Sequence, residues 1–478
     1  MNKILTKQIK PILWLLCLGF MTQTSMAQLS LQAGWAIIAS QYDEKGYGMD
    51  FDQGGYATYI CSESVNSNGT AYDAIYRGLD YGSGWNHSKT FGGTGANDKA
   101  LFVKSYMTAG TEKILSIGHF NGTVDMGGGV FGQTFTSNFG NAIFITSTVK
   151  NTNQNYWRNS IIPTTASASV FLTDFYYDAV GGYFYLTGTI ENNVNFSGTI
   201  VNGGERKGIF FAKYDLSGNL QWAKAISSPN VYTSGYVART QGGSICSDAS
   251  GNVYVSAFLG NDNNWDVDPN AGTTNIQTDA LPSGFDNMFI GKYSSTGNLV
   301  SYITWGGAGV FSASVPKVTK IKMSGTSLIA SGTVSNSTPN FNPLGTAKTI
   351  TTSQDAIFVA SYNSTNLNCN WVQGANSTGG LSTKVTDLQI APDAAIYVSG
   401  YFANAITFPG LATNVSTGGT DMLVARFWSN GLPSFTSSWG GPGDDGINSM
   451  LLGNGLVYIN GYCSSNFDFD PSAASTVW

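Results

Sequence analysis

The sequence predicts an all-β fold, a β-propeller, and three observations support this prediction. An apolar pattern like "IFFAKY" recurs at spacings of 65 to 79 residues. A second pattern, centred on a glycine as in "YLTGTI", lies between these and keeps a similar period. Glycine accounts for 59 of the 478 residues and only 11% of residues are charged, against roughly a quarter in an average globular protein. Short strands repeated at this spacing, without helical periodicity, are typical of propeller blades.

Both repeat series can be followed along most of the chain. The first series starts at Ile75, Ile143, Ile209, Met288, Ile357 and Met422. The second is centred on Ser62, Gly118, Gly188, Ala257, Gly332, Gly400 and Gly461. Because two independent markers keep a common spacing, chance apolar runs do not explain them. Six complete units and one partial unit predict seven blades.

The order of segments within one unit predicts four strands. A short apolar segment such as "GGSICSDASG" is followed by the glycine-centred strand, a variable loop, the "IFFAKY" strand, a turn and a last strand. In "DLSGN" the turn residues Gly218 and Asn219 tolerate positive φ, so they suit a tight connection between the two outer strands. We expect a bulky residue at the start of the last strand to cover the packing between neighbouring blades. The residues at this place are Trp85, Trp157, Trp222, Trp371 and Phe435.

The two ends of the repeat region predict how the ring closes. The stretch "WAIIAS" from Trp35 matches "WAKAIS" from Trp222 but has no blade of its own before it. The final unit has only its first two strands before Trp478, so the last blade is incomplete in this chain. We therefore expect the strand from Trp35 to complete the blade that contains Gly461. Such pairing would remove an open sheet edge.

The N-terminus predicts export. Residues 1–27 combine lysines, an apolar stretch from Ile12 to Phe20, and small residues that end at Ala27, which is typical of a cleaved signal peptide. Residues 28–478 would then form one propeller domain, secreted or at the cell surface. No later segment approaches the ~18 apolar residues of a membrane helix, and no Lys/Arg cluster suits nucleic acid. We expect no membrane span, no nucleic-acid partner and a monomeric protein.

The repeats resemble those of a known group, the SBBP (seven-bladed β-propeller) repeat proteins that Bacteroidetes secrete. The resemblance covers residues 30–478 and rests on "FFAKYDLSGNLQWAKAI", "SICSDASGNVYVSAFLG", "WDVDPNAG", "FDFDP" and "WGGPGDDGINSM". It implies a propeller and export. It implies no particular activity.

Residues suited to catalysis are scarce. The chain has two histidines, His87 and His119, and they occupy non-equivalent positions of their repeats. We expect both to have surface or packing roles. The four cysteines after residue 27 form no CxxC pair, so we expect buried, apolar thiols rather than a zinc site. The chain has only five arginines, which argues against the arginine triad that a sialidase-like propeller uses to bind a substrate carboxylate. We therefore predict no catalytic residue, no cofactor and no enzyme activity.

Two acidic turns are candidates for calcium binding. Asp266 and Asp268 in "NWDVDPN", and Asp468 and Asp470 in "NFDFDPS", place two carboxylates at alternate positions of an extended segment. Alternate side chains project to one side, and carboxylate oxygens are good calcium ligands. The interpretation we prefer is that these carboxylates accept backbone N–H bonds within the turn. The equivalent stretch "NFNPLG" lacks both acids, which argues against an ion in every blade.

These observations favour a non-catalytic binding scaffold for a protein or a glycan. The variable loops 190–207 and 259–284 would present the binding face. The alternative is a polysaccharide-active enzyme that uses carboxylates on one propeller face. In that case carboxylates should converge in the centre or on one rim, whereas in a scaffold they should be scattered. Asp444 and Asp445 have a partial counterpart at Asp98, so we expect them to be structural.

Overall fold

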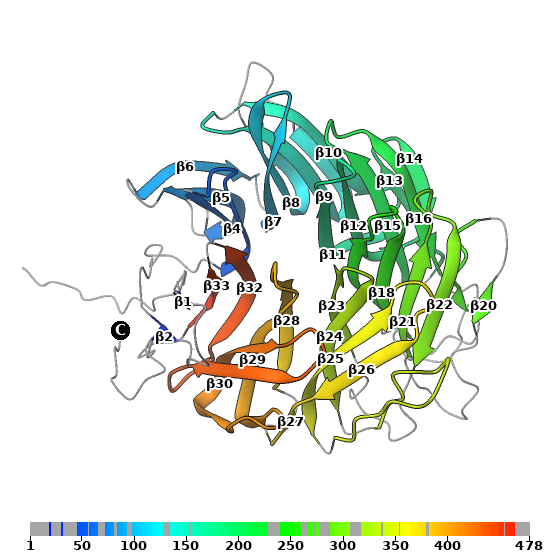
Figure 1. The fold of residues 1–478 in the computed structure, drawn as a ribbon. Helices are drawn as coiled ribbons and strands as arrows, with labels where there is room; N and C mark the ends of the chain where they lie inside the picture. Colours follow the sequence, from blue (N-terminus) through cyan, green and yellow to red (C-terminus); the bar gives the residue numbers. More distant parts are fainter. Residues whose placement is uncertain are drawn as a thin grey trace, which may run out of the picture.

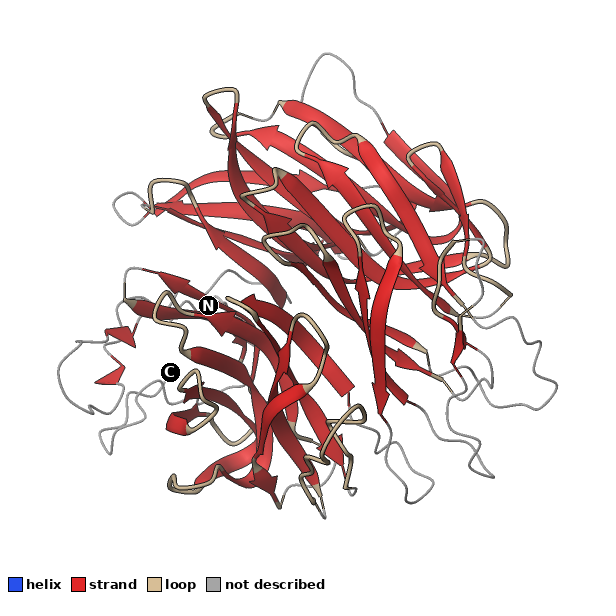
Figure 2. Cartoon of the chain, turned by 45° about the vertical axis from the view of Figure 1, so that its right-hand side comes forward, coloured by secondary structure: helices blue, strands red, loops and turns tan. Residues whose placement is uncertain are grey.

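The computed structural model contains only β-structure in the part of the chain that it describes (Figure 2). The described residues are 19–20, 30–31, 45–55, 57–65, 72–80, 84–92, 98–127, 134–152, 154–205, 207–227, 240–260, 265–270, 274–276, 287–305, 317–335, 338–352, 354–378, 382–453 and 455–463. Among them there is no helix long and apolar enough to cross a membrane.

Six antiparallel sheets of at least four strands follow one another along the chain and stand around a common centre (Figure 1). Blade 1 consists of β3 (Lys45–Phe51), β4 (Ala57–Val65), β5 (Tyr72–Asp80) and β6 (Gly84–Phe91). Blade 2 consists of β7 (Lys99–Thr108), β8 (Thr111–Asp125), β9 (Thr134–Val149) and β10 (Asn155–Pro163). Blade 3 consists of β11 (Ser169–Asp178), β12 (Tyr183–Glu191), β15 (Gly208–Asp215) and β16 (Leu220–Ile226). Blade 4 consists of β17 (Gln241–Ser247), β18 (Val253–Leu259), β21 (Asn287–Tyr293) and β22 (Leu299–Trp305). Blade 5 consists of β23 (Lys317–Ser324), β24 (Ser327–Ser335), β25 (Asp355–Asn363) and β26 (Cys369–Gly374). Blade 6 consists of β28 (Lys384–Ile390), β29 (Ile396–Thr407), β30 (Asn414–Phe427) and β31 (Pro433–Trp439). The predicted propeller of four-stranded units is confirmed.

Shorter strands decorate these blades. The hairpin of β13 (Asn193–Phe196) and β14 (Thr199–Asn202) pairs with β10 and extends blade 2 at its outer edge. It lies within the loop 190–207 that the sequence suggested as part of a binding face. β19 (Trp265–Asp266) pairs with β20 (Asn275–Ile276), and β27 (Asn376–Ser377) pairs with β29.

A last sheet contains β32 (Gly446–Gly453) and β33 (Leu456–Tyr462), together with two-residue strands β1 (Gly19–Phe20) and β2 (Ser30–Leu31). β1 pairs with β33 only at Leu456 and Val457. The predicted closing strand, residues 35–40, lies outside the described residues. The structure therefore establishes six blades in a ring, and closure by that strand stays a prediction.

The first strand of each blade is the innermost one, because neighbouring first strands contact one another. Such contacts join β3 with β7, β11 with β17, β17 with β23, β23 with β28, β28 with β32, and β32 with β3. Each innermost strand carries a β-bulge where its register with the second strand shifts. In blade 3, for example, Leu172 pairs with Gly188 and Asp174 with Thr187, so Thr173 is the extra residue.

The bulge explains the glycine series. A Cβ placed on Gly118, Gly188 or Gly400 would overlap the backbone carbonyl oxygen of Lys99, Phe171 or Lys384, respectively. A carbonyl in a sheet has no room to retreat, so these three positions need glycine. At the equivalent positions Ser62 and Ala257, the paired residue of the innermost strand is itself a glycine, Gly46 or Gly242. The second sequence marker is therefore a consequence of the innermost strand lying unusually near its neighbour.

Trp157 and Trp222 contact the next blade, as predicted, whereas the side chain of Trp85 lies outside the described residues. The indole Nε1 of Trp157 donates to the carbonyl oxygen of Leu216 at 2.8 Å, in the turn between β15 and β16. Trp222 does the same to Ser295 at 3.0 Å in blade 4. Gly218 in the first of these turns has φ +84° and leaves space for the Trp157 ring. Each turn glycine thus serves both its own backbone conformation and the ring of the preceding blade.

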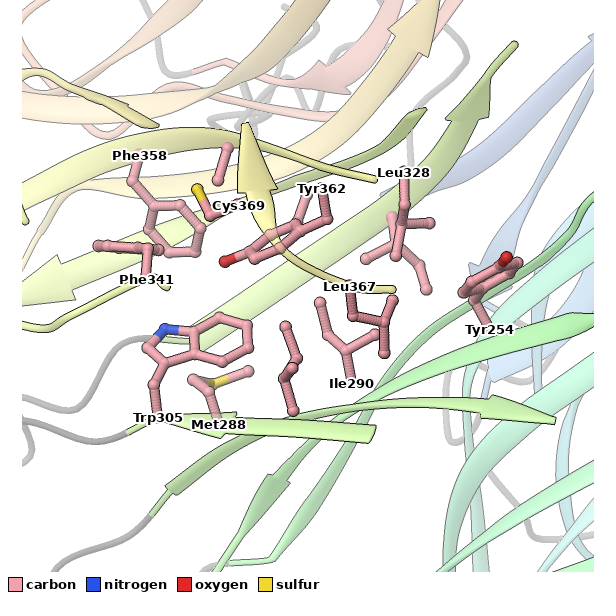
Figure 3. Close-up of a cluster of buried hydrophobic side chains, with 14 of the residues drawn as sticks. Tyr254, Met288, Ile290, Trp305, Leu328, Phe341, Phe358, Tyr362, Leu367 and Cys369 are labelled. Carbon is pink, nitrogen blue, oxygen red and sulfur yellow. The ribbon is translucent and has the colours of Figure 1, made fainter. Parts of the chain in front are cut away.

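Apolar side chains fill the space between neighbouring blades. Figure 3 shows one such cluster, with Met288 and Trp305 from blade 4 facing Phe358 and Tyr362 from blade 5. The rings of Trp305 and Tyr362 have centroids 5.7 Å apart. Full burial of a large apolar side chain contributes about 1.5–3 kcal/mol, so each blade interface is a substantial part of the core. The same cluster includes Cys369.

The four cysteines in the described part of the chain are Cys61, Cys246, Cys369 and Cys463. All four are buried and unpaired. Burial raises the pKa of Cys369 and of Cys463 to about 12, so these thiols stay neutral at physiological pH. They behave as the small apolar residues that we expected.

Candidate functional site

Charged and amide side chains of five innermost strands gather at the centre of the ring. We call this group the central cluster. Its members are Asp50 on β3, Lys104 on β7, Asp174 on β11, Lys320 and Lys322 on β23, and Asp387 and Gln389 on β28. Residues two apart on a strand project to the same side, which is why β23 and β28 each contribute two members.

Asp50 and Lys104 connect blades 1 and 2. The Lys104 Nζ lies 2.8 Å from Asp50 Oδ1, and Asp50 Oδ2 accepts the backbone N–H of Ser105 at 2.7 Å. Burial raises the pKa of Asp50, and the neighbouring Lys104 counteracts part of this rise. Both carboxylate oxygens are therefore engaged, one by a cation and one by the backbone of the next blade.

Asp174 and Lys320 form an ion pair between blades 3 and 5. The innermost strand of blade 4 lies between them, and its Ser244 accepts the backbone N–H of Ile321 in blade 5 at 3.1 Å. Asp174 also accepts hydrogen bonds from the Ser244 hydroxyl and from a backbone N–H of β17. Burial alone would lower the pKa of Lys320, but the nearby carboxylates, Asp174 above all, outweigh burial and raise it.

Lys322 differs from the other two central lysines. Its Nζ donates to the side-chain oxygen of Gln389 at 2.7 Å. Gln389 Nε2 in turn donates to the Met450 carbonyl at 2.7 Å and to Asp387 Oδ2 at 3.2 Å. Asp387 Oδ2 also accepts the Met450 N–H at 2.8 Å. Burial lowers the pKa of Lys322, and Lys320 lowers it further, while Asp387 acts in the opposite direction.

Side chains at equivalent positions join neighbouring innermost strands. Asp174 accepts the N–H of Ile245 at 3.1 Å, and Ser244 accepts that of Ile321 at 3.1 Å. The bond from the Met450 N–H to Asp387 repeats this pattern between blade 6 and β32. In blades 3, 4 and 6 the side chain at this position therefore satisfies a backbone donor of the next innermost strand, which is a structural role.

His119 has a similar connecting role. Its Nε2 accepts the backbone N–H of Leu172 in the next blade at 2.8 Å. At the equivalent place in blade 3, the Thr189 hydroxyl accepts the N–H of Gly242 at 3.1 Å. Burial lowers the pKa of His119 to about 4, so the ring is neutral and available as an acceptor at physiological pH. This is the packing role expected for His119; the side chain of His87 lies outside the described residues.

A second charged group lies between blades 1 and 2, where Lys150 binds two carboxylates. Its Nζ lies 2.8 Å from Asp52 Oδ2 and 2.7 Å from Glu112 Oε2. Glu112 also accepts the Ser105 hydroxyl at 2.6 Å and the N–H of Gln53 at 3.0 Å. With both acids bonded to a cation, the group stabilises the contact between the blades and offers no free base.

The first calcium candidate is a hydrogen-bonded turn. Asp266 Oδ1 accepts the N–H groups of Asp268 and Thr274, at 3.1 and 3.0 Å. At the equivalent position, Asn340 Oδ1 accepts two N–H groups at 3.0 and 3.1 Å. A neutral amide therefore makes the same two bonds, which need one oxygen and no ion. The second candidate, Asp468 and Asp470, lies outside the described residues.

Calcium binding at these residues stays a hypothesis. The described part of the chain contains no group of three or more His, Cys, Asp or Glu side chains arranged to hold a metal. The oxygens that the turn uses for backbone N–H groups would have to be shared with an ion, because carboxylates accept several bonds.

Two carboxyl groups are deeply buried, those of Asp98, just before β7, and Asp421, on β30. Asp421 lies beside Asp445, and its pKa is raised to about 6, mainly by burial and also by Asp445. Asp98 lies near Asp73, and burial raises its pKa to about 7. Asp445 accepts the Gly441 N–H at 2.7 Å, and Asp444 accepts the Thr420 N–H at 3.0 Å. The bonds of Asp444 and Asp445 fit the structural role that we expected for them.

The sequence interpretation did not identify the central cluster. One signal was available: "KVTKIKM" at 317–323 and "KVTDLQI" at 384–390 occupy the same place in their repeats and carry charged or amide side chains at alternate positions. Charged residues are scarce in this chain, so charges on an innermost strand stand out. These residues come together only in the folded ring, so the sequence alone does not show that they meet.

Comparison with protein-family models gave no match, and comparison with curated proteins gave none either. The class of protein that the fold and the site define is a β-propeller with a charged centre. The functional conclusion below depends on the residues of this chain alone.

Proposed function

We propose that this protein is an exported, non-catalytic propeller of the SBBP kind, and that its central face binds a protein or a glycan. The observation that supports this proposal is the state of the central carboxylates. Asp50 and Asp174 each have an ion-paired lysine and a backbone N–H, and Asp387 accepts N–H groups of Met450 and Gln389. A general acid or base needs a carboxyl group free to exchange a proton with substrate.

The finer architecture belongs to the same proposal. Residues 35–40 would pair with β33 and complete a seventh blade. Two contacts between the first and last sheets support a closed ring: Asn448 Nδ2 donates to the Gly46 carbonyl at 2.6 Å, and the rings of Phe51 and Tyr458 have centroids 4.7 Å apart. Closure would remove the open edge of β33 beyond Val457. Cleavage after Ala27 would precede secretion.

The enzyme alternative retains one argument in its favour. Carboxylates do gather at the centre, which is the arrangement expected of a polysaccharide-active enzyme. Lysines bind these carboxylates, and this pairing favours a structural or recognition role over proton transfer. The alternative would gain support only if substrate displaced one of these lysines.

The test is a binding screen and an activity screen on the same protein. Residues 28–478 are tested against a glycan array and against a polysaccharide panel, with and without calcium. We expect binding without turnover. Turnover that is lost in Asp174→Asn, with the fold retained by circular dichroism, would replace the scaffold proposal with the enzyme alternative.

A further inference from the structure

We infer that Lys322 is the recognition point for a single negative charge on a bound glycan, the carboxylate of an acidic sugar. The inference builds on the proposed binding function and names the class of ligand. It begins from an asymmetry among the three central lysines.

Lys104 and Lys320 each have a carboxylate partner, but Lys322 has none at ion-pair distance in the part of the chain that the structure describes. The Lys322 Nζ makes its hydrogen bond to Gln389 Oε1, a neutral acceptor, at 2.7 Å. An ammonium group has three N–H donors, and this bond uses one of them. Two donors of a partly buried cation remain for a ligand.

No ion pair joins Asp387 to Lys322 among the described residues, although the charge of Asp387 raises the pKa of Lys322. Its Oδ2 accepts the Met450 N–H at 2.8 Å and the Gln389 Nε2 at 3.2 Å, and its Oδ1 accepts the N–H of Leu388 at 2.8 Å. These bonds turn the carboxylate toward β32. Gln389 therefore lies between Lys322 and the nearest acid on β28.

The surrounding acids do not make up for the burial of Lys322, which is the largest influence on its pKa. Asp387 and Asp174 favour its charged form, whereas Lys320 and Lys104 disfavour it, and burial lowers its pKa. Burying a cation without a counter-charge is unfavourable. A bound anion would supply that charge and make up for the lost hydration.

The rest of the central cluster restricts the ligand. Three lysines stand beside three aspartates, so a polyanion would meet repulsion as well as attraction, whereas a single carboxylate needs only Lys322. Two partly exposed aromatic rings flank the other lysines: Lys104 Nζ lies 5.6 Å from the centre of the Tyr177 ring, and Lys320 Nζ lies 5.7 Å from that of Phe102. Aromatic faces beside polar groups suit the stacking of sugar rings. We therefore favour a uronic-acid sugar over a peptide carboxylate.

The first experiment follows the Lys322 amine itself. The pKa of Lys322 is measured by NMR on residues 28–478, with sodium glucuronate, sodium acetate and neutral glucose as probes. We expect glucuronate to raise this pKa and glucose to leave it unchanged. An unchanged pKa with glucuronate would overturn the inference, whatever the protein otherwise binds. Acetate acting as strongly as glucuronate would overturn the assignment to a sugar.

The second experiment compares an oligosaccharide that contains glucuronic acid with its carboxyl-reduced, neutral form by calorimetry. We expect at least about tenfold tighter binding of the acidic form, which corresponds to about 1.4 kcal/mol. Lys322→Met should remove this preference. Lys224→Met is the matched control, because Lys224 Nζ also donates to a neutral amide oxygen, that of Asn270 at 2.8 Å; it should leave the preference intact.

A third variant keeps the test decisive if Lys322→Met does not fold. Gln389→Glu is nearly isosteric and supplies a carboxylate where the ligand would bind, so it should raise the Lys322 pKa and weaken binding of the acidic oligosaccharide at least tenfold. Unchanged affinity in Gln389→Glu would contradict the inference. If neither oligosaccharide binds while glucuronate still raises the Lys322 pKa, the glycan function fails and the anion site remains. Tighter binding of a peptide carboxylate would also overturn the glycan assignment.

Discussion

The outer strands and the innermost strands of this propeller use the same repeat in opposite ways. On the outside, Trp157 and Trp222 make the same contact, an indole N–H bonded to a carbonyl in the turn of the next blade. At the centre, the position after the bulge carries Asp174 in blade 3, Ser244 in blade 4 and Lys320 in blade 5. Positions that repeat their residue maintain the blade interfaces. Positions that vary on the same backbone decide which charged and polar groups meet at the centre.

The largest effect should come from breaking the repeated close approach at the bulge. Gly188→Val places side-chain atoms on the Phe171 carbonyl oxygen and should destabilise the protein by about 3 kcal/mol or more. Chemical denaturation measures the change. Ala257→Gly, at the same position of blade 4, is the control and should cost no more than about 1 kcal/mol. Equal effects of the two variants would contradict the explanation of the glycine series.

A smaller loss is expected from the outer contact. Trp157→Ala removes a half-buried ring and its 2.8 Å bond to Leu216, so the free energy of unfolding should fall by about 2 kcal/mol, less than for a fully buried tryptophan. Trp157→Phe keeps the apolar contact and loses only the hydrogen bond. It should recover about half of the loss, and a complete loss in Trp157→Phe would show that packing is not the main term.

The buried acid at the start of blade 2 should make stability depend on pH. The pKa of Asp98 rises from 3.8 to about 7 in the folded state, so folding favours the protonated form. The stabilisation is fully present below about pH 4 and is lost as the pH rises through 7. Asp98→Asn should be more stable than the parent at pH 8, by at least the ~1.4 kcal/mol of one pKa unit, and should flatten the profile between pH 4 and 7. Parallel profiles would contradict this assignment.

The smallest effect is expected at the junction of the first and last sheets. Asn448→Ala removes the bond to the Gly46 carbonyl and should lower the free energy of unfolding by about 1 kcal/mol. Hydrogen exchange of β3 and β32 should rise together if this bond helps to close the ring. Asn430→Ala, in an exposed turn of blade 6, is the control. Exchange that rises only in β32 would argue against a shared junction.

Much of the fold could be predicted because it is periodic. Four strands per unit, the turn at Gly218 and the contact of Trp222 with the next blade follow from short-range patterns, since short apolar runs such as that of β15, which is buried almost throughout, alternate with turn residues. The hairpin of residues 193–202 was not foreseen. The sequence indicated a variable loop at 190–207, part of which pairs with β10 of the preceding blade, and such pairing leaves no repeated signal in the sequence.

The central cluster needed the tertiary structure. Asp174 and Lys320 are 146 residues apart, and no local pattern connects them. Their meeting depends on the convergence of the innermost strands, where Ser244 of β17 bonds to Asp174 on one side and to the Ile321 N–H on the other. The neutral partner of Lys322 could not be predicted from the sequence either, because it depends on which side chains the neighbouring strands bring close.

The sequence by itself determined the strands, their order within a unit and the positions where glycine or tryptophan recurs, because these depend on interactions that every repeat makes again with its neighbour. Only the tertiary structure decided which charges meet, because the ring brings together the one strand of each blade that lies nearest the centre. There, Asp50, Asp174 and Asp387 find partners on other blades, while Lys322 keeps a neutral one. Charge pairing depends on distances in space, and a one-dimensional repeat records only distances along the chain.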